Sequence, residues 1–170
     1  MNTKTRYIPF VFALVLALST LGIATSTALA QKPVKSEYQM STTGVLTGVC
    51  TFDITNDSTN DVTEIDYFDQ SGSLTRMEWH IVEQDTFTAN GKSLVGIPFT
   101  FNVKVLFDSQ GFMTHVYADG VTEKIWLPDG RLFISAGRVD FAAHGFPQYI
   151  LSPDYGNPGN IAGFCAALAP

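Results

Sequence analysis

The sequence predicts an all-β domain in which an antiparallel meander closes into a small barrel of about seven to nine strands. Segments rich in Val, Ile, Phe, Thr and Tyr alternate apolar and polar residues, which is typical of strands. Turn signals separate these segments at 69–72, 89–91, 108–111 and 128–130. Strands joined by tight turns are antiparallel neighbours, and closure removes exposed strand edges. A two-sheet sandwich is the alternative architecture.

The turns at 69–72 and 108–111 are expected to be three-residue hairpin loops that end in a glycine bulge. The second loop then pairs Val105 with His115, which turns His115 and Tyr117 toward the interior. An imidazole there needs a hydrogen-bond partner, so it is either a structural residue or a group that orients a ligand. The interior expected from both hairpins contains a candidate ligand-binding set: Tyr67, Trp79, Phe101, His115 and Tyr117.

The same register predicts a charged group on the opposite, solvated face, formed by Asp66, Arg76, Glu78 and His80. Such a group is either an acid/base cluster or a set of cross-strand ion pairs, and surface pairs of this kind are common. The sequence leaves the register of the hairpin at 128–130 open. Gly96 with Pro98 predicts a break within a long strand segment, because both residues weaken a strand interior.

The sequence predicts a short C-terminal helix and a disulfide that joins it to the start of the folded domain. Asn160 is a candidate N-cap for a short helix that starts at Ile161, in which Phe164 and Leu168 share one face. Cys50 and Cys165 are the two cysteines of the chain, and in an oxidising compartment they are expected to form a disulfide. Residues 31–44 allow one short edge strand or a tail.

The first thirty residues have the order of a secretory signal peptide. Lys4 and Arg6 precede a long apolar run, and small residues follow it up to Ala30. We therefore expect a signal peptide at 1–30, a single domain at 31–170, a secreted or extracytoplasmic location, and no stable membrane anchor after cleavage. Without Lys4 and Arg6 the domain has eight basic and sixteen acidic residues, a net charge of −8. This balance excludes a nucleic-acid partner, which requires a basic surface.

Acidic residues gather between Asp53 and Asp69, and we expect a solvated acidic loop there. Calcium is the alternative, but the spacing misses the EF-hand pattern and its glycine. The three histidines form no local zinc motif, and Gly91-Lys92-Ser93 lacks the earlier glycine of a phosphate-binding loop. No metal and no cofactor are expected.

Three features together resemble a known group of proteins: the Asp-x-x-Gly turns, Gly137-Arg138-Val139, and the ending Phe164-Cys165-Ala166-Ala167-Leu168. The group consists of small secreted bacterial proteins, frequent in actinobacteria, with an early Cys and a terminal C-A-A-L. It has no established activity, so the resemblance assigns no functional residue. At the level of the fold, the chain is also similar to the barrels of lipocalins and of allene oxide cyclase or dirigent proteins.

The favoured hypothesis is a non-catalytic secreted barrel that binds a small apolar or aromatic molecule, or a surface partner. The second hypothesis is an isomerase- or cyclase-like enzyme in which His115, Tyr117 or Glu78 moves a proton inside the barrel. A structural protein with a filled core and no ligand is the third. The oligomeric state is not predicted.

Overall fold

The computed structural model describes residues 31–144 and 151–170, so the expected signal peptide lies outside the described residues. The described chain forms one antiparallel sheet of eight strands and two short helices. The elements in chain order are β1 (Val34–Leu46), β2 (Ile54–Phe68), β3 (Leu74–Ala89), β4 (Lys92–Val95), β5 (Phe99–Phe107), β6 (Met113–Trp126), β7 (Leu132–Asp140), α2 (Phe141–His144), β8 (Tyr155–Asn157) and α3 (Ile161–Leu168).

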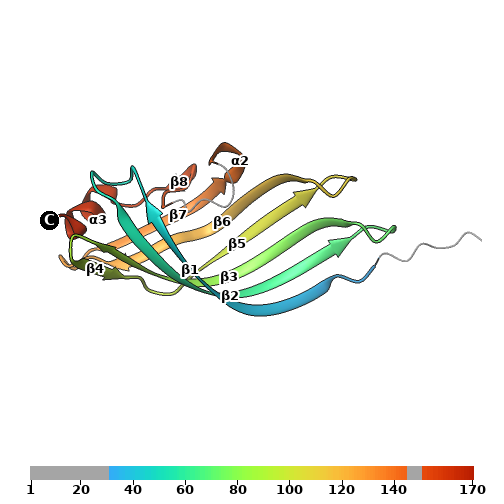
Figure 1. Ribbon diagram of the computed structural model, residues 1–170, viewed down its shortest axis with the longest axis horizontal. Helices are drawn as coiled ribbons and strands as arrows, with labels where there is room; N and C mark the ends of the chain where they lie inside the picture. Colours follow the sequence, from blue (N-terminus) through green and yellow to red (C-terminus); the bar gives the residue numbers. More distant parts are fainter. Residues whose placement is uncertain (1–30, 145–150) are drawn as a thin grey trace, which may run out of the picture.

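The strand order is β1-β2-β3-β5-β6-β7-β8, with β4 paired to β3, which confirms the antiparallel meander. Gly96 and Pro98 lie in the break between β4 and β5, so both short strands follow the same edge of β3. The barrel is not confirmed, because within the described residues β1 and β8 lie at opposite margins of an open sheet. Figure 1 shows the two long hairpin tips at one end and α3 at the other. Near α3, the end of β1 and the start of β2 cross over the neighbouring strands.

Three hairpin loops share one geometry. The loop after Asp69 closes with a hydrogen bond from the Asp69 amide to the Ser73 carbonyl at 2.9 Å, and Gly72 has a φ of +85°. The loop after Asp108 repeats this arrangement, which confirms the expected three-residue form. The loop at 128–130 has it too, with Leu127 bonded to Arg131. The sequence left that register open.

A second bulge follows each of the first two loops and changes the faces of the strands. Phe68 faces Leu74 as expected, but the register then shifts, and Tyr67 faces Arg76. Thr75 is the extra residue, and its hydroxyl donates a hydrogen bond to the Tyr67 carbonyl at 3.1 Å. In the next hairpin Thr114 has the same role, with the same 3.1 Å bond to Leu106. The extra residue exchanges the two faces of the partner strand, so the predicted faces of β2 and β6 are wrong, whereas β3 and β5 have the faces that were predicted.

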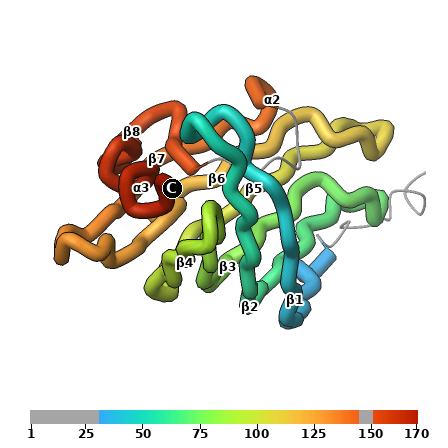
Figure 2. Tube along the Cα trace, turned by 60° about the vertical axis from the view of Figure 1, so that its left-hand side comes forward, coloured from blue at the N-terminus to red at the C-terminus, as the bar shows by residue number. Residues whose placement is uncertain are grey.

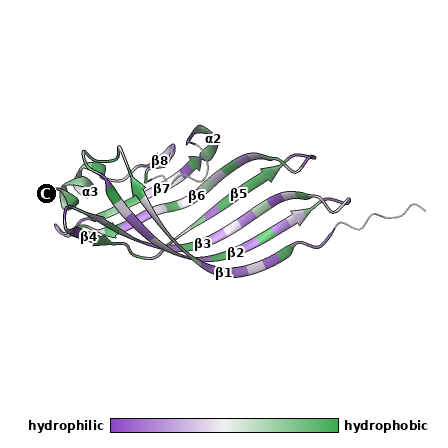
Figure 3. Ribbon diagram, viewed as in Figure 1, coloured by the Kyte–Doolittle hydropathy of each residue, from purple (hydrophilic) through white to green (hydrophobic). Residues whose placement is uncertain are grey.

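One face of the sheet, here called the inner face, carries two separate hydrophobic clusters. The first lies near α3 and includes Ile54, Phe87 and Phe133, all fully buried. The second lies on the central strands and includes Val105 and Val116. The opposite face, the outer face, is mainly polar, and Figure 3 shows the resulting alternation of hydrophilic and hydrophobic residues along the strands. This alternation is what a sheet with one buried face requires.

The acidic stretch from Asp53 to Asp69 was expected to be a solvated loop, and this expectation is wrong. Residues 54–68 form β2, which pairs with β1 on one side and β3 on the other. Polar inward residues such as Ser58 and Asn60 are buried beside the neighbouring strands. Because these inward residues are polar, the sequence of this strand does not show the period-2 alternation of apolar and polar residues that predicts a strand.

The C-terminal helix α3 closes the first hydrophobic cluster. The Asn160 side chain caps it by accepting a hydrogen bond from the Gly163 amide at 3.0 Å, as expected. The Phe164 ring is fully buried, with its centroid 5.2 Å from that of Phe87 and 5.3 Å from that of Phe133. Aromatic contacts at these separations add to the free energy of burial.

We expect Phe164→Ala to lower the free energy of unfolding by about 3–5 kcal/mol, because it leaves a cavity between two other rings. Chemical denaturation followed by tryptophan fluorescence measures the change. Ala162→Ser is the matched control, since Ala162 is an exposed residue of the same helix. Equal stability of the two variants would show that α3 does not anchor the cluster.

The predicted disulfide is present between Cys50 and Cys165, with a Cα–Cα distance of 5.6 Å. It joins the loop between β1 and β2 to α3. The chain segment that it closes spans 115 residues. Among the described residues, no helix is long and apolar enough to cross a membrane.

Candidate functional site on the outer face

The five residues expected to share one ligand site lie on two faces of the sheet. Tyr67, His115 and Tyr117 are on the outer face, because the Thr75 and Thr114 bulges shift their registers. His115 faces Leu106 rather than Val105. Trp79 and Phe101 are on the inner face, packed against the second hydrophobic cluster. The sheet separates the two groups, so they do not form the predicted interior site.

The charged group expected on the outer face is also divided. Arg76, Glu78 and His80 lie there as predicted, on alternate residues of β3. Asp66 faces Met77 and is therefore on the inner face. The bulge at Thr75 is again the cause, because it moves Asp66 out of register with Arg76.

A hollow of about 260 Å³ opens on the outer face over β2, β3, β5 and β6. The polar groups at its wall include a carboxylate, an ammonium, an imidazole, an amide and a phenol. Eight of the lining residues have side chains on the outer face: Thr63, Ile65, Glu78, His80, Asn102, Lys104, Tyr117 and Asp119. The other two, Trp79 and Val103, have side chains on the inner face.

Glu78 is the centre of the contacts at one side of the hollow. Its carboxylate accepts a hydrogen bond from the Tyr67 hydroxyl at 3.0 Å. The Arg76 Nε and Lys104 Nζ atoms each lie 3.3 Å from the same carboxylate oxygen. The Arg76 guanidinium also covers the Tyr67 ring at 3.9 Å. Hydrogen bonds with Tyr117 and then Glu78 raise the pKa of Lys104, so it stays protonated at neutral pH.

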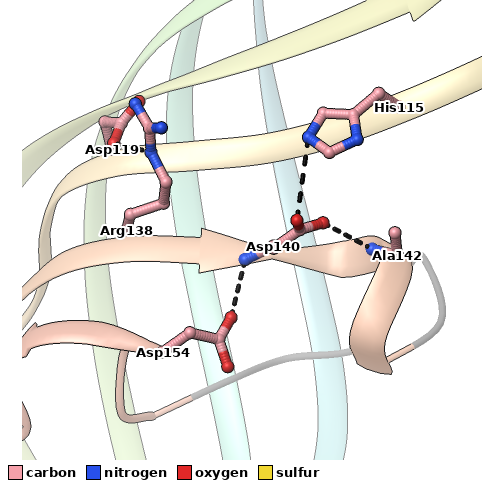
Figure 4. A network of polar contacts seen from close by, with 6 residues as sticks. All are labelled: His115, Asp119, Arg138, Asp140, Ala142 and Asp154. Carbon is pink, nitrogen blue, oxygen red and sulfur yellow. Dashed lines mark hydrogen bonds and ion pairs between the residues drawn. The ribbon is translucent and has the colours of Figure 1, made fainter.

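Tyr117 connects this group to a second one on β6 and β7. Arg138 lies over its ring at 4.8 Å and makes a two-pronged contact with Asp119, at 2.7 and 3.0 Å. This hydrogen bond raises the pKa of Arg138. Figure 4 shows Asp140 beside them, 3.8 Å from the His115 imidazole. His115, Tyr117 and Asp119 occupy alternate positions of β6, so all three point away from the inner face.

Asp140 in turn fixes the start of α2 and the segment before β8. Its carboxylate accepts a hydrogen bond from the Ala142 amide at 3.0 Å, and its own amide donates to Asp154 at 2.7 Å (Figure 4). Asp154 also contacts the His144 imidazole at 2.6 Å. The bond from the Asp140 amide and the contact with His144 lower the pKa of Asp154. The carboxylates near His115 are therefore engaged in structure.

His80 and Asn102 form the remaining polar pair at the wall of the hollow. The His80 Nδ1 atom lies 2.9 Å from the Asn102 Oδ1 atom across β3 and β5. With the proton on Nδ1, this contact leaves the Asn102 amide NH₂ group as a donor and the His80 Nε2 atom as an acceptor. Both residues are exposed to solvent.

The inner face holds a carboxyl pair that sequence reasoning missed. Glu83 and Asp85 are 8% and 0% exposed and lie between the two hydrophobic clusters. Burial, the charge of Asp85 and a hydrogen bond between the two side chains raise the pKa of Glu83 to about 9. The signal was available, because both residues occupy the same alternate positions of β3 as the inward residues Ile81 and Phe87.

A third acidic group lies on the inner face, beside the second hydrophobic cluster. The Glu64 carboxylate accepts hydrogen bonds from Trp79 Nε1 and from the Tyr38 hydroxyl, both at 2.8 Å. Burial, then the bond to Glu64, raises the pKa of Tyr38 to about 12. Burial and the charge of Glu64 raise the pKa of Asp66. These contacts hold β1, β2 and β3 together where the second cluster ends.

Within residues 31–144 and 151–170, no group of three or more His, Cys, Asp or Glu side chains is arranged to hold a metal ion. Comparison with protein-family models, with curated proteins and with solved structures finds no match for this sequence. The outer face therefore has to be interpreted from its own chemistry. It offers many hydrogen-bonding groups in an open hollow, where Glu78 lies near Lys104 and Asp119 near Arg138.

Proposed function

We propose that this protein is an exported, non-catalytic binding protein whose outer-face hollow takes a small ligand rich in hydroxyl or amide groups, such as a saccharide. The observation that carries the proposal is the convergence of donors and acceptors from β2, β3, β5 and β6 on one hollow. The ligand class differs from the apolar or aromatic molecule expected from the sequence. The reason is that the aromatic residues on which that expectation rested lie on two faces.

The balance of charge in the hollow favours a neutral ligand. Lys104 is matched by Glu78, and Arg138 is matched by Asp119. A net charged ligand would compete with these pairs. A hydroxyl-rich ligand can instead donate to the carboxylates and accept from the Asn102 amide without breaking either pair.

A second hollow of about 370 Å³ on the same face supports a ligand of more than one ring. Its wall consists mainly of hydroxyl, amide and carboxylate groups. The lining residues are Ser41, Thr42, Thr43, Asp57, Ser58, Thr59, Gln84, Thr86 and Val95. A chain of sugar rings laid across the outer face would find hydrogen-bonding groups in both hollows.

The openness of the hollow supports binding rather than a reaction. General acid/base catalysis gains most from groups held in a water-excluded site. The Glu78 carboxylate already accepts a hydrogen bond from Tyr67 and lies in ion pairs with Arg76 and Lys104. His115 is 38% exposed beside a carboxylate engaged in structure. The enzyme hypothesis required these residues in an enclosed cavity, and no observation on the outer face favours it.

The disulfide supports the proposed location outside the cytosol, because such bonds persist in oxidising compartments. The predicted signal peptide agrees with it. Membership of the small secreted bacterial proteins that the sequence resembles is part of the same proposal. It adds no ligand.

The proposal predicts that the exported protein binds neutral oligosaccharides and that Asn102→Ala weakens the binding about three- to tenfold, since one hydrogen bond is lost. Isothermal titration with a panel of neutral oligosaccharides measures the affinity, and native mass spectrometry of freshly purified protein detects a ligand that co-purifies. Thr88→Ala is the control, because Thr88 is exposed on the same face of β3 outside both hollows. Absence of binding to the panel, or equal affinity of both variants, would contradict the proposal and favour the structural protein.

A further inference from the structure

Strand β1 forms a long free edge of the sheet. It pairs with β2 on one side only, and every residue from Val34 to Val45 is exposed. Figures 1 and 2 both show the first part of β1 at the margin of the sheet, while its end crosses over other strands. The backbone amides and carbonyls of this edge are therefore open to a further strand.

The middle of this edge has none of the features that normally prevent strands from pairing. Charged residues, prolines, bulges and shortness are the usual protections. Here Pro33, Lys35 and Glu37 lie near the start, while residues 38–43 contain no charge and no proline. The pairing of β1 with β2 is continuous from Val34 to Leu46, so no bulge turns the edge away.

Apolar side chains accompany the free edge on the inner face. Val34, Tyr38 and Met40 are 49%, 41% and 44% exposed, and they occupy alternate positions of the strand. Exposed apolar side chains are ordinary when they are scattered, but these three lie in one row beside unpaired backbone. A strand added here would cover them.

We propose that β1 is a dimerisation edge, where a second copy of this chain adds its own β1 in antiparallel orientation about a two-fold axis at Gln39. Tyr38 then faces Met40 of the second copy, and the same contact occurs twice. Sulfur–aromatic contacts of this kind are favourable. A strand pair over about ten residues also forms about ten backbone hydrogen bonds.

The charges of β1 do not oppose the pairing of this edge with a second copy of itself. In this register Glu37 faces Ser41 of the second copy and Lys35 faces Thr43, so no like charges oppose each other. The acidic residues next to the edge are already engaged. Asp57 accepts a hydrogen bond from Thr43, and Asp61 accepts one from Gln39, each at 2.6 Å. Glu64 and Asp66 also lie on β2, one strand from the edge, and salt will screen their repulsion of the second copy.

Substitutions that introduce a charge at Met40 test the proposal. We expect the purified protein to sediment as a dimer at micromolar concentrations, and Met40→Lys and Met40→Glu each to weaken dimerisation about tenfold or more, because the two side chains are diagonal neighbours. An equal mixture of the two variants should recover the dimer. That recovery would show that both variants are folded. Val82→Lys is the matched control, since Val82 is an exposed apolar residue on a central strand.

The register has its own test. Gln39→Cys places two thiols opposite each other on the axis and should give a disulfide-linked dimer under mild oxidation. Thr43→Cys should not, because it faces Lys35 of the second copy. A wild-type protein that sediments as a monomer throughout the micromolar range would overturn the proposal. So would a dimer that Met40→Lys and Met40→Glu leave intact, and dimers cross-linked equally by both cysteines would overturn the register.

Discussion

Glu83→Gln is expected to raise the free energy of unfolding at pH 7 by about 3 kcal/mol. Glu83 is 8% exposed, and its pKa of about 9 lies far above the usual value of 4.5. At pH 7 the folded protein therefore carries a proton on Glu83 that the unfolded chain releases. Holding that proton costs about 1.4 kcal/mol for each pH unit above 4.5, and pH 7 is 2.5 units above it. A glutamine keeps a donor for Asp85 and removes this cost.

The sign of the pH dependence follows from the same shift. Below about pH 4.5 Glu83 is protonated in both states, and its contribution to stability is fully present. As the pH rises toward 9, the folded state binds more protons than the unfolded state, so the free energy of unfolding falls. Above the folded pKa the contribution is lost. Glu83 thus makes the protein more stable near pH 5 than near pH 8.

Urea denaturation of the wild-type protein and of Glu83→Gln at several pH values between 5 and about 9 measures both effects. The two stability curves should converge at the acid end and separate as the pH rises. Glu37→Gln is the control, because it makes the same chemical change at an exposed residue and should leave the slope unchanged. Parallel curves for the wild type and Glu83→Gln would show that Glu83 is ionised in the folded protein.

The Glu83–Asp85 pair also explains why the inner face has two hydrophobic clusters. Both side chains lie among other buried polar residues, including Ser58 and Asn60 on β2 and Glu123 on β6. Glu123 accepts a hydrogen bond from the Lys124 amide at 2.7 Å. A layer of buried polar groups has to satisfy its hydrogen bonds internally, so it fixes the alignment of the strands around it more strictly than apolar packing does.

The strand positions were predictable from the sequence because the turn chemistry is strong. Asp69-x-x-Gly72 and Asp108-x-x-Gly111 predict three-residue loops, and the structure has them. The faces were not predictable from the turns alone, because each loop is followed by a second bulge. The two hairpins share a threonine, Thr75 or Thr114, at the same distance after the loop glycine. That repeated threonine is a sequence signal for the second bulge.

Part of the candidate site was predictable from the sequence, but Asn102, Lys104 and Asp119 were not among the predicted residues. Tyr67, Glu78 and Tyr117 were all singled out, yet the sequence assigned the tyrosines to the core and Glu78 to the solvent. A shift of one residue on β2 and on β6 brings them together around the outer hollow. Successive side chains of a strand point to opposite faces, so one bulged residue reverses the faces of all residues beyond it. Such a reversal is enough to turn a predicted buried ligand site into an open polar one.

Replacing both cysteines by serine is expected to lower the free energy of unfolding by about 5 kcal/mol. In the chain-entropy model the cost follows from the 115-residue segment that Cys50–Cys165 closes. The open sheet gives the bond a local role as well. Within the described residues β1 and β8 do not pair, so the disulfide is the covalent link between the β1–β2 loop and α3. Its loss should loosen the first hydrophobic cluster more than the second.

Guanidinium denaturation of Cys50→Ser/Cys165→Ser measures the global effect, and Thr51→Ser is the control beside the disulfide. A loss of about 5 kcal/mol would leave a domain of ordinary stability close to unfolding. Hydrogen exchange then separates the two regions. We expect amides of α3 and of the start of β2 to exchange much faster in the double variant, while those near Val105 and Val116 keep more of their protection. Uniform acceleration would show that the two clusters unfold as one unit, and an unchanged denaturation midpoint would show that Phe164 and its neighbours hold α3 without the covalent bond.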